Sequence, residues 1–133
     1  MKAITANPTR ALNIGSLVLA ADNSGARIVR IVSVKRGKTK KRTQQYAKVG
    51  DLVKVSVRKG NPKMKGEVFE AIVIRVKKPF RRNTGERVMF EDNSVALLKD
   101  SKGNPKGTQI KGPVAREILE RWGGVAKIAQ FVL

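Results

Sequence analysis

The sequence predicts a small, mainly β protein, either a closed barrel or a sandwich, with a short helical part at its C-terminal end. Two observations lead to this class. Short runs of Val, Ile and Ala are separated by turn residues about every ten positions as far as Asp100. After Asp100 the apolar residues take the spacing of a helix. At 133 residues, the chain is expected to form one domain over 1–133.

The first half of the chain predicts an N-terminal arm followed by three strands. Residues 1–13 are of mixed polarity and contain Pro8, so we expect no regular structure there. The segment Asp22-Asn23-Ser24-Gly25 predicts a turn, because Asn and Gly tolerate positive φ and Asp bonds nearby amides. The strands are expected over residues 16–21, 27–34 and 52–58, and in the last of these valines alternate with polar residues.

The middle of the chain predicts three more strands after a break at Gly60-Asn61-Pro62. The longest apolar stretch covers residues 67–76, and its segment Ala71-Ile72-Val73-Ile74 is apolar at both odd and even positions. A strand with that pattern is expected to be covered on both faces. Shorter strands are expected over residues 87–90 and 94–98.

The C-terminal part, residues 101–133, predicts a loop and two helices. Residues 101–111 contain Gly103, Pro105 and Gly107, which favour a loop. Pro113 is expected at the first position of a helix, where its missing N–H is not needed. The helix would end at Gly123-Gly124, and a second short helix is expected over 125–130. One helical face would carry the apolar residues Val114, Ile118, Leu119 and Trp122, which predicts packing for Trp122.

Basic residues are concentrated in the predicted turns. The chain has 29 Lys and Arg against 10 Asp and Glu, a net charge of +19, and residues 35–87 alone contain 18 of these cations and 4 acids. A surface that repels itself in this way is typical of a protein whose countercharge comes from a polyanion, which indicates nucleic acid. Our candidates for phosphate contacts are Arg27, Arg30, Lys35, Arg36, Lys38, Lys40, Lys41, Arg42, Lys59, Lys63, Lys65, Lys77, Lys78, Arg81 and Arg82.

The composition excludes several classes of chemistry. The chain has no Cys and no His, which rules out disulfides, thiolate metal sites and catalytic systems built on His. We therefore expect no cofactor and no metal. No apolar run approaches the roughly 20 residues of a membrane span. The N-terminus lacks the pattern of a signal peptide, so we expect a cytoplasmic protein with no membrane contact.

Local motifs do not support an enzyme. Gly37-Lys38-Thr39 resembles the end of a phosphate-binding loop, but Val32 stands where that motif needs Gly. The acids at Asp22, Asp51 and Glu91-Asp92 lie beside turn residues and are expected to stabilise turns.

Few aromatic residues lie near the basic segments. Tyr46, Phe69 and Phe80 are a small supply for base stacking, which disfavours the recognition of single strands. Contacts to the phosphates and the shape of folded RNA fit this composition better.

Taken together, five strings resemble the universal large-subunit ribosomal protein fourteen family. They occur in this order over residues 16–133: Ala21-Asp22-Asn23-Ser24-Gly25-Ala26-Arg27, Val49-Gly50-Asp51, Ala71-Ile72-Val73-Ile74-Arg75 with Arg81-Arg82, Phe90-Glu91-Asp92-Asn93-Ser94, and Gly107-Thr108-Gln109-Ile110-Lys111-Gly112-Pro113-Val114-Ala115-Arg116-Glu117. Gln109, Lys111 and the long N-terminal arm resemble the archaeal or eukaryotic form of the family more than the bacterial one.

The resemblance implies a five-stranded β-barrel with a C-terminal loop and helices. It also implies binding to large-subunit ribosomal RNA, a place at the subunit interface, bridges to small-subunit ribosomal RNA and contacts with neighbouring large-subunit proteins. In archaea and eukaryotes it further implies docking of anti-association initiation factor six. Our candidates for bridge and protein contacts are Lys111, Arg116, Arg121 and Trp122.

Two other classes of function stay open at this stage. A free-standing basic barrel, acting as an RNA chaperone or a translation-initiation factor, would have the same charge and strand pattern. An enzyme would need carboxylate or Lys chemistry, and no spacing in the sequence supports it.

Overall fold

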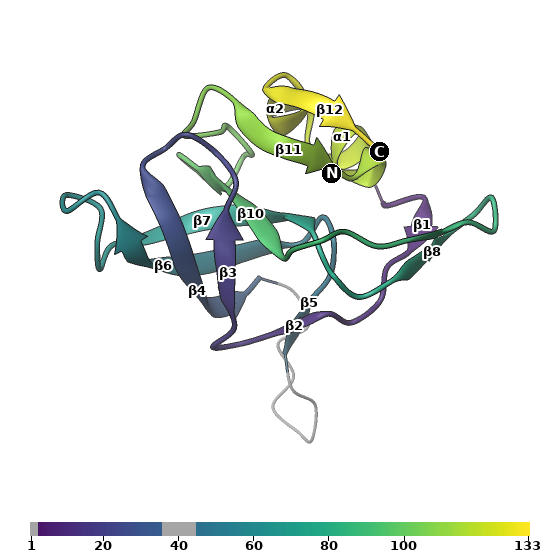
Figure 1. Cartoon of the computed structure of the whole chain (residues 1–133), viewed down its shortest axis with the longest axis horizontal. Coiled ribbons are helices and arrows are strands. Elements are labelled where there is room, and N and C mark those ends of the chain that lie inside the picture. Colours follow the sequence, from purple (N-terminus) through teal and green to yellow (C-terminus); the bar gives the residue numbers. More distant parts are fainter. Residues whose placement is uncertain (1–2, 36–44) are drawn as a thin grey trace.

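In the computed structural model, residues 3–35 and 45–133 are described (Figure 1). Within these residues five strands close into a barrel in the order β10-β3-β4-β6-β7. Strand β10 runs parallel to β3, and the other neighbours are antiparallel. The mainly β fold and the barrel are thus confirmed. The strands are β3 (Leu17–Ala20), β4 (Ala26–Val34), β6 (Leu52–Gly60), β7 (Val68–Arg75) and β10 (Ser94–Leu98).

Alternation along β6 explains how the barrel fills its interior. Val53, Val55 and Val57 are buried, whereas Lys54 and Arg58 point outward into solvent. Successive side chains of a strand lie on opposite faces, so the valines enter the core and the cations stay on the surface. The same sequence pattern therefore builds both the hydrophobic core and part of the basic surface.

The C-terminal part covers the strands that are apolar on both faces. Residues 71–75 of β7 and the whole of β10 are buried. Strand β11 (Ile110–Val114) lies beside them, with the Lys111 N–H donating to the Ala21 carbonyl and the Ala115 N–H to the Ile74 carbonyl. Figure 1 shows β11 and the elements after it lying together over one side of the barrel. The predicted cover on both faces of 71–74 is confirmed.

The N-terminal arm contains regular structure, so our expectation for residues 1–13 was wrong. Strand β1 (Ala6–Asn7) pairs with β8 (Phe80–Arg82), which also pairs with β9 (Arg87–Val88). Strand β2 (Leu12–Asn13) pairs with β5 (Tyr46–Ala47). Pro8 lies between the two short strands, where it disturbs neither pairing. The strand predicted over 87–90 is also shorter than expected.

The C-terminal elements differ from the prediction at three points. Pro113 belongs to β11, and α1 (Arg116–Arg121) begins three residues later. The glycines expected to end that helix begin α2 (Gly123–Ala126). The helix predicted over 125–130 was wrong after Ala126, because β12 (Ala129–Val132) pairs in parallel with β11. No helix within 3–35 and 45–133 has the length and apolar character needed to cross a bilayer.

Candidate nucleic-acid interface

The turn between β3 and β4 is held by its own polar side chains. The Asp22 carboxylate accepts hydrogen bonds from the Leu97 N–H at 2.9 Å and from the Ser24 hydroxyl at 2.7 Å. The Asn23 side-chain oxygen accepts a bond from the Thr108 N–H at 2.8 Å. A β-carbon on Gly107 would lie 2.7 Å from that oxygen, so the glycine permits the contact. The turn-stabilising role predicted for Asp22 is confirmed.

Three cations from three separate strands surround a hollow beside this turn. Arg27 comes from β4, Lys59 from β6 and Lys111 from β11, and the hollow has a volume of about 650 Å³. We call these three side chains and the space between them the cationic hollow. The carboxylate of Asp22 also lines it, but that side chain is buried and bound to the Leu97 N–H and the Ser24 hydroxyl.

Glycine at position 60 lets β4 and β6 approach each other behind the cationic hollow. Its φ is +151°, and a β-carbon there would lie 2.6 Å from the Gly25 carbonyl oxygen. The Asn61 N–H donates to the same oxygen at 2.9 Å. The start of β4 and the end of β6 are therefore fixed together, which sets the separation of Arg27 and Lys59.

A second hollow, of about 500 Å³, adjoins the first through Lys59. Arg30 and Arg58 supply its other cations. Arg30 was a predicted contact residue. Arg58 was not, although its outward position after Val57 in the alternating strand could have identified it.

Other predicted cations lie in two places on either side of the barrel. Lys63 and Lys65 are exposed on the hairpin between β6 and β7. Lys77, Lys78 and Arg81 are exposed on the segment that leads from β7 through β8. Figure 1 shows that hairpin and the β8–β9 hairpin extending in opposite directions from the barrel. The predicted basic segments thus form separate groups in the described part of the chain.

Two predicted contact residues, Arg82 and Lys35, form ion pairs with carboxylates of the protein itself. Arg82 is buried, with its Nε donating to Glu117 Oε1 at 2.7 Å and its Nη2 to the Leu133 carbonyl. Because β8 alternates, Phe80 and Arg82 point inward and Arg81 points outward. We therefore leave Arg82 out of the candidate surface. Lys35 is partly exposed and pairs with Glu70.

Five further candidates, Arg36, Lys38, Lys40, Lys41 and Arg42, lie outside the described residues.

Trp122 packs in the core, as its helical position predicted. Its exposed fraction is 6%, and its ring N–H donates to the Gly50 carbonyl at 2.9 Å. A β-carbon on Gly103 would lie 2.8 Å from the ring, so the loop needs glycine there. The indole is therefore covered in the free chain and is a poor candidate for a bridge contact.

The other three C-terminal candidates differ in exposure. Lys111 and Arg116 are exposed. Arg121 is half-buried, with its Nη1 3.8 Å from Asp51 Oδ1. Lys111 and Arg116 are thus the members of this set best placed to meet a partner.

The loop before β11 is ordered by one exposed carboxylate. Asp100 accepts hydrogen bonds from the Asn104 side chain at 2.9 Å and from the Lys102 N–H at 3.0 Å. The bond from the Asn104 side chain is the main reason why the pKa of Asp100 is lowered.

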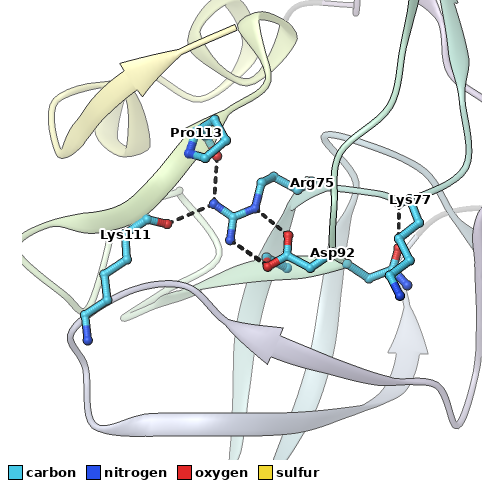
Figure 2. A network of polar contacts seen from close by, with 7 residues as sticks. Arg75, Lys77, Asp92, Lys111 and Pro113 are labelled. Atoms are coloured by element: carbon cyan, nitrogen blue, oxygen red, sulfur yellow. Dashed lines mark hydrogen bonds and ion pairs between the residues drawn. The ribbon is translucent and has the colours of Figure 1, made fainter.

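Arg75 is a central residue of the site that the sequence did not reveal. Its guanidinium donates to both oxygens of Asp92, to the carbonyls of Lys111 and Pro113, each at 2.8 Å, and to the Ser94 hydroxyl (Figure 2). It therefore joins the end of β7, the start of β10 and the middle of β11. Lys111 enters the cationic hollow from a backbone that Arg75 holds in place.

Asn93, the residue after Asp92, fixes the basic segment that follows β7. Its side-chain oxygen accepts a hydrogen bond from the Lys77 N–H at 2.9 Å (Figure 2). Figure 2 thus shows one polar cluster from which both Lys77 and Lys111 extend.

The aromatic residues near the basic segments are engaged within the protein. Tyr46 lies under the Arg10 guanidinium, 4.4 Å from the ring centre, and Phe69 lies 4.5 Å from the Lys106 ammonium group. Phe80 is buried. Base stacking on these rings would require the existing contacts to break, which agrees with a surface that binds phosphates.

Comparison with known proteins identifies the family. The family model for ribosomal protein L14p/L23e matches residues 11–133. The chain belongs to this family. Over all 133 residues and the full length of each relative, it is 52% identical to large ribosomal subunit protein uL14 of Nanoarchaeum equitans, 47% to that of Methanothrix thermoacetophila and 46% to that of Halobacterium salinarum.

Membership of the L14p/L23e family confirms the resemblance seen in the five sequence strings. The archaeal character expected from Gln109 and Lys111 agrees with these archaeal relatives. As a ribosomal protein of this family, the chain is a structural protein and not an enzyme.

Proposed function

We propose that this chain, as a structural constituent of the large ribosomal subunit, binds large-subunit ribosomal RNA through the cations around its barrel. The observation that carries the proposal is the cationic hollow, where Arg27, Lys59 and Lys111 converge from three strands. Arg forms planar, paired contacts with phosphate, and Lys supplies a mobile charge. Because the three cations converge on one hollow, the site suits a bend of the RNA backbone.

The pairing of charges within the protein supports the same role. Among the described residues, no carboxylate lies within 4.0 Å of the cationic groups of the hollow or of the exposed cations Lys63, Lys65, Lys77, Lys78 and Arg81. With a net charge of +19, the free protein repels itself, and RNA phosphates would supply the countercharge. The proposed surface comprises Arg27, Arg30, Arg58, Lys59, Lys63, Lys65, Lys77, Lys78, Arg81 and Lys111.

The C-terminal part is our candidate for contacts beyond this RNA. Arg116 is exposed where the C-terminal elements cover the barrel. We propose that this side meets small-subunit ribosomal RNA across the subunit interface, neighbouring large-subunit proteins and, in a ribosome of archaeal type, anti-association initiation factor six. The chain would then act within the cytoplasmic ribosome.

Sedimentation tests the proposed function against the free-standing alternative. A tagged chain is expressed in cells, and large subunits are isolated and washed at high salt. A structural constituent remains on the washed large subunits at about one copy per subunit. A chaperone or an initiation factor is lost from them in the wash, and that result would contradict the proposal.

A further inference from the structure

An irregularity in the pairing of β4 with β6 turns an extra side chain outward beside the cationic hollow. Ile28 lies opposite Lys59, and the next residue of β4 lies opposite Val57. Arg58 therefore has no partner on β4. An unpaired residue of this kind forms a β-bulge, which bends the strand and redirects its side chains. As a result Arg58 and Lys59, although consecutive, are both exposed and both line the hollow of about 500 Å³.

A second irregularity, on β4, joins this hollow to the cationic hollow. Arg27 lies between two paired residues whose partners, Lys59 and Gly60, are consecutive, so Arg27 has no partner of its own. It is exposed and lines the cationic hollow, whereas the next residue, Ile28, lines the hollow of about 500 Å³. Lys59 lines both. We call the hollow of about 500 Å³ the mixed hollow.

The mixed hollow combines two apolar side chains with its cations. Leu17 of β3 and Ile28 of β4 line it, and Leu17 is 63% exposed. Arg30 lies opposite Leu17, but its guanidinium lies close to the backbone of Gly15. A β-carbon on Gly15 would lie 3.5 Å from Arg30 Nη2. Leu17 and Ile28 thus offer an apolar surface to whatever the cations of the mixed hollow bind.

The cations of the mixed hollow belong to the proposed RNA surface, so its occupant should also be RNA. An acidic protein segment would compete with RNA phosphates for Arg30, Arg58 and Lys59. Among the described residues that line the mixed hollow, none is acidic. Phosphates alone would satisfy the cations but leave Leu17 and Ile28 in contact with water. The part of a nucleotide that suits those two side chains is its uncharged base.

A base can reach the mixed hollow only if it is unpaired. In an A-form helix the faces of the bases are covered by their stacked neighbours, whereas an extruded base can lie against apolar side chains. The volume of the mixed hollow is within the range of small-molecule sites, roughly 300–1,000 Å³. Because Tyr46 and Phe69 are engaged with cations of the protein, the contact would be with aliphatic side chains.

We propose that the mixed hollow holds the base of one extruded nucleotide of the ribosomal RNA, while the phosphate next to that base lies in the cationic hollow. Lys59 lines both hollows, so it lies between the two parts of the nucleotide. Leu17 and Ile28 contact the face of the base and form no hydrogen bonds with its edge, so each of the four bases fits. The inference rests on the proposed function, and it adds the recognition of an unpaired nucleotide to the phosphate contacts.

Three RNA hairpins with the same stem test the proposal. The first is fully paired, the second carries one bulged adenosine, and the third has an abasic nucleotide in place of that adenosine. The abasic hairpin keeps the phosphates of the bulge and removes only the base. The affinity of the full chain for each hairpin is measured, together with that of Leu17→Ser. Leu19→Ser is the matched control, because Leu19 is 44% exposed on the same strand but does not line the mixed hollow.

The unsubstituted chain should bind the adenosine bulge at least about fivefold more tightly than the abasic bulge, the low end of what stacking of one base on an aromatic ring contributes. Leu17→Ser should remove most of this difference and Leu19→Ser should keep it, while the abasic hairpin binds all three proteins equally. Equal affinity of the unsubstituted chain for the two bulges would overturn the inference, and so would equal behaviour of the two variants.

Failure of the proposed function gives a different result. In that case the unsubstituted chain binds none of the three hairpins, and the inference falls with the proposed function. Failure of the inference alone leaves strong binding to all three hairpins, with no gain from the bulged base.

Discussion

The Arg75 guanidinium donates two hydrogen bonds to the carboxylate of Asp92, from Nε at 2.8 Å and from Nη2 at 3.1 Å. The side chain of Arg75 is only 8% exposed, so the carboxylate of Asp92, more than water, stabilises its positive charge. The same guanidinium binds the carbonyls of Lys111 and Pro113, so the ion pair also fixes β11 against the barrel. The position of Lys111 in the cationic hollow therefore depends on a residue that does not contact the hollow.

Asp92→Ala should destabilise the protein by roughly 3 kcal/mol, the low end of the cost of leaving a buried charge without its partner. The low end applies because the Asp92 side chain is 31% exposed, so water can partly replace it. Denaturant unfolding measures the change. The neighbouring variant Glu91→Ala should change the free energy of unfolding by less than about 0.5 kcal/mol. Equal losses in the two variants would show that the ion pair has no special role.

Gly112→Ala should cost more stability than Gly85→Ala. Both glycines have positive φ, +81° and +92°, so alanine is strained at either position. A β-carbon at Gly112 would also lie 2.6 Å from Arg75 Nη1, whereas nothing lies within 4 Å at Gly85. We expect the contact with Arg75 to add roughly 1–3 kcal/mol, as overpacking does in other cores. The comparison of the two unfolding curves isolates that contact, and equal costs would mean that Arg75 moves aside freely.

The contact between Arg75 and β11 explains why Pro113 lies in a strand and not at the start of a helix. Gly-Pro before an amphipathic segment favours a helix start in sequence, yet here Gly112 and Pro113 extend β11. The Arg75 guanidinium binds the carbonyls on either side of Gly112, and only the tertiary structure brings Arg75 there. Strand β12 was missed for a similar reason, because its partner β11 is separated from it by two helices.

The barrel strands were predictable because their signals are local. Val53, Val55 and Val57 show the period of two, and the turn at Asp22–Gly25 carries its own stabilising side chains. The basic site was predictable only in part. A list of cations cannot tell Arg81 from Arg82, since the inward direction of Arg82 depends on Glu117, a residue 35 positions away.

Trp122→Ala should destabilise the protein by roughly 3–5 kcal/mol, the usual cost of deleting a large buried aromatic side chain. The chain has one tryptophan, so its fluorescence reports this site alone. The unsubstituted protein should emit at the short wavelengths of a buried indole and shift to longer wavelengths on unfolding. Emission typical of a solvated indole in the folded protein, with normal stability of the alanine variant, would show that the ring is exposed.

Neutralising the cationic hollow should weaken RNA binding more than an equal loss of charge elsewhere. The test variant combines Arg27→Gln, Lys59→Gln and Lys111→Gln. The control combines Lys99→Gln, Lys102→Gln and Lys127→Gln, three exposed positions outside the proposed surface. Affinity for a folded fragment of large-subunit ribosomal RNA is measured at several salt concentrations. The slope of log affinity against log salt should become shallower by roughly 3 in the test variant, since each phosphate contact contributes about 0.9. The same change in the control would mean that only net charge matters.

The salt dependence of the unsubstituted protein tests most directly whether the separate basic groups act as one phosphate-binding surface. If the chain neutralises about ten phosphates of a folded ribosomal RNA fragment, log affinity should fall against log salt with a slope of roughly −9, on the coefficient for duplex DNA. The proposed surface predicts that steep slope, with little discrimination between folded RNAs of different sequence. A slope near −2 would mean that about two phosphates are contacted, and it would contradict the account.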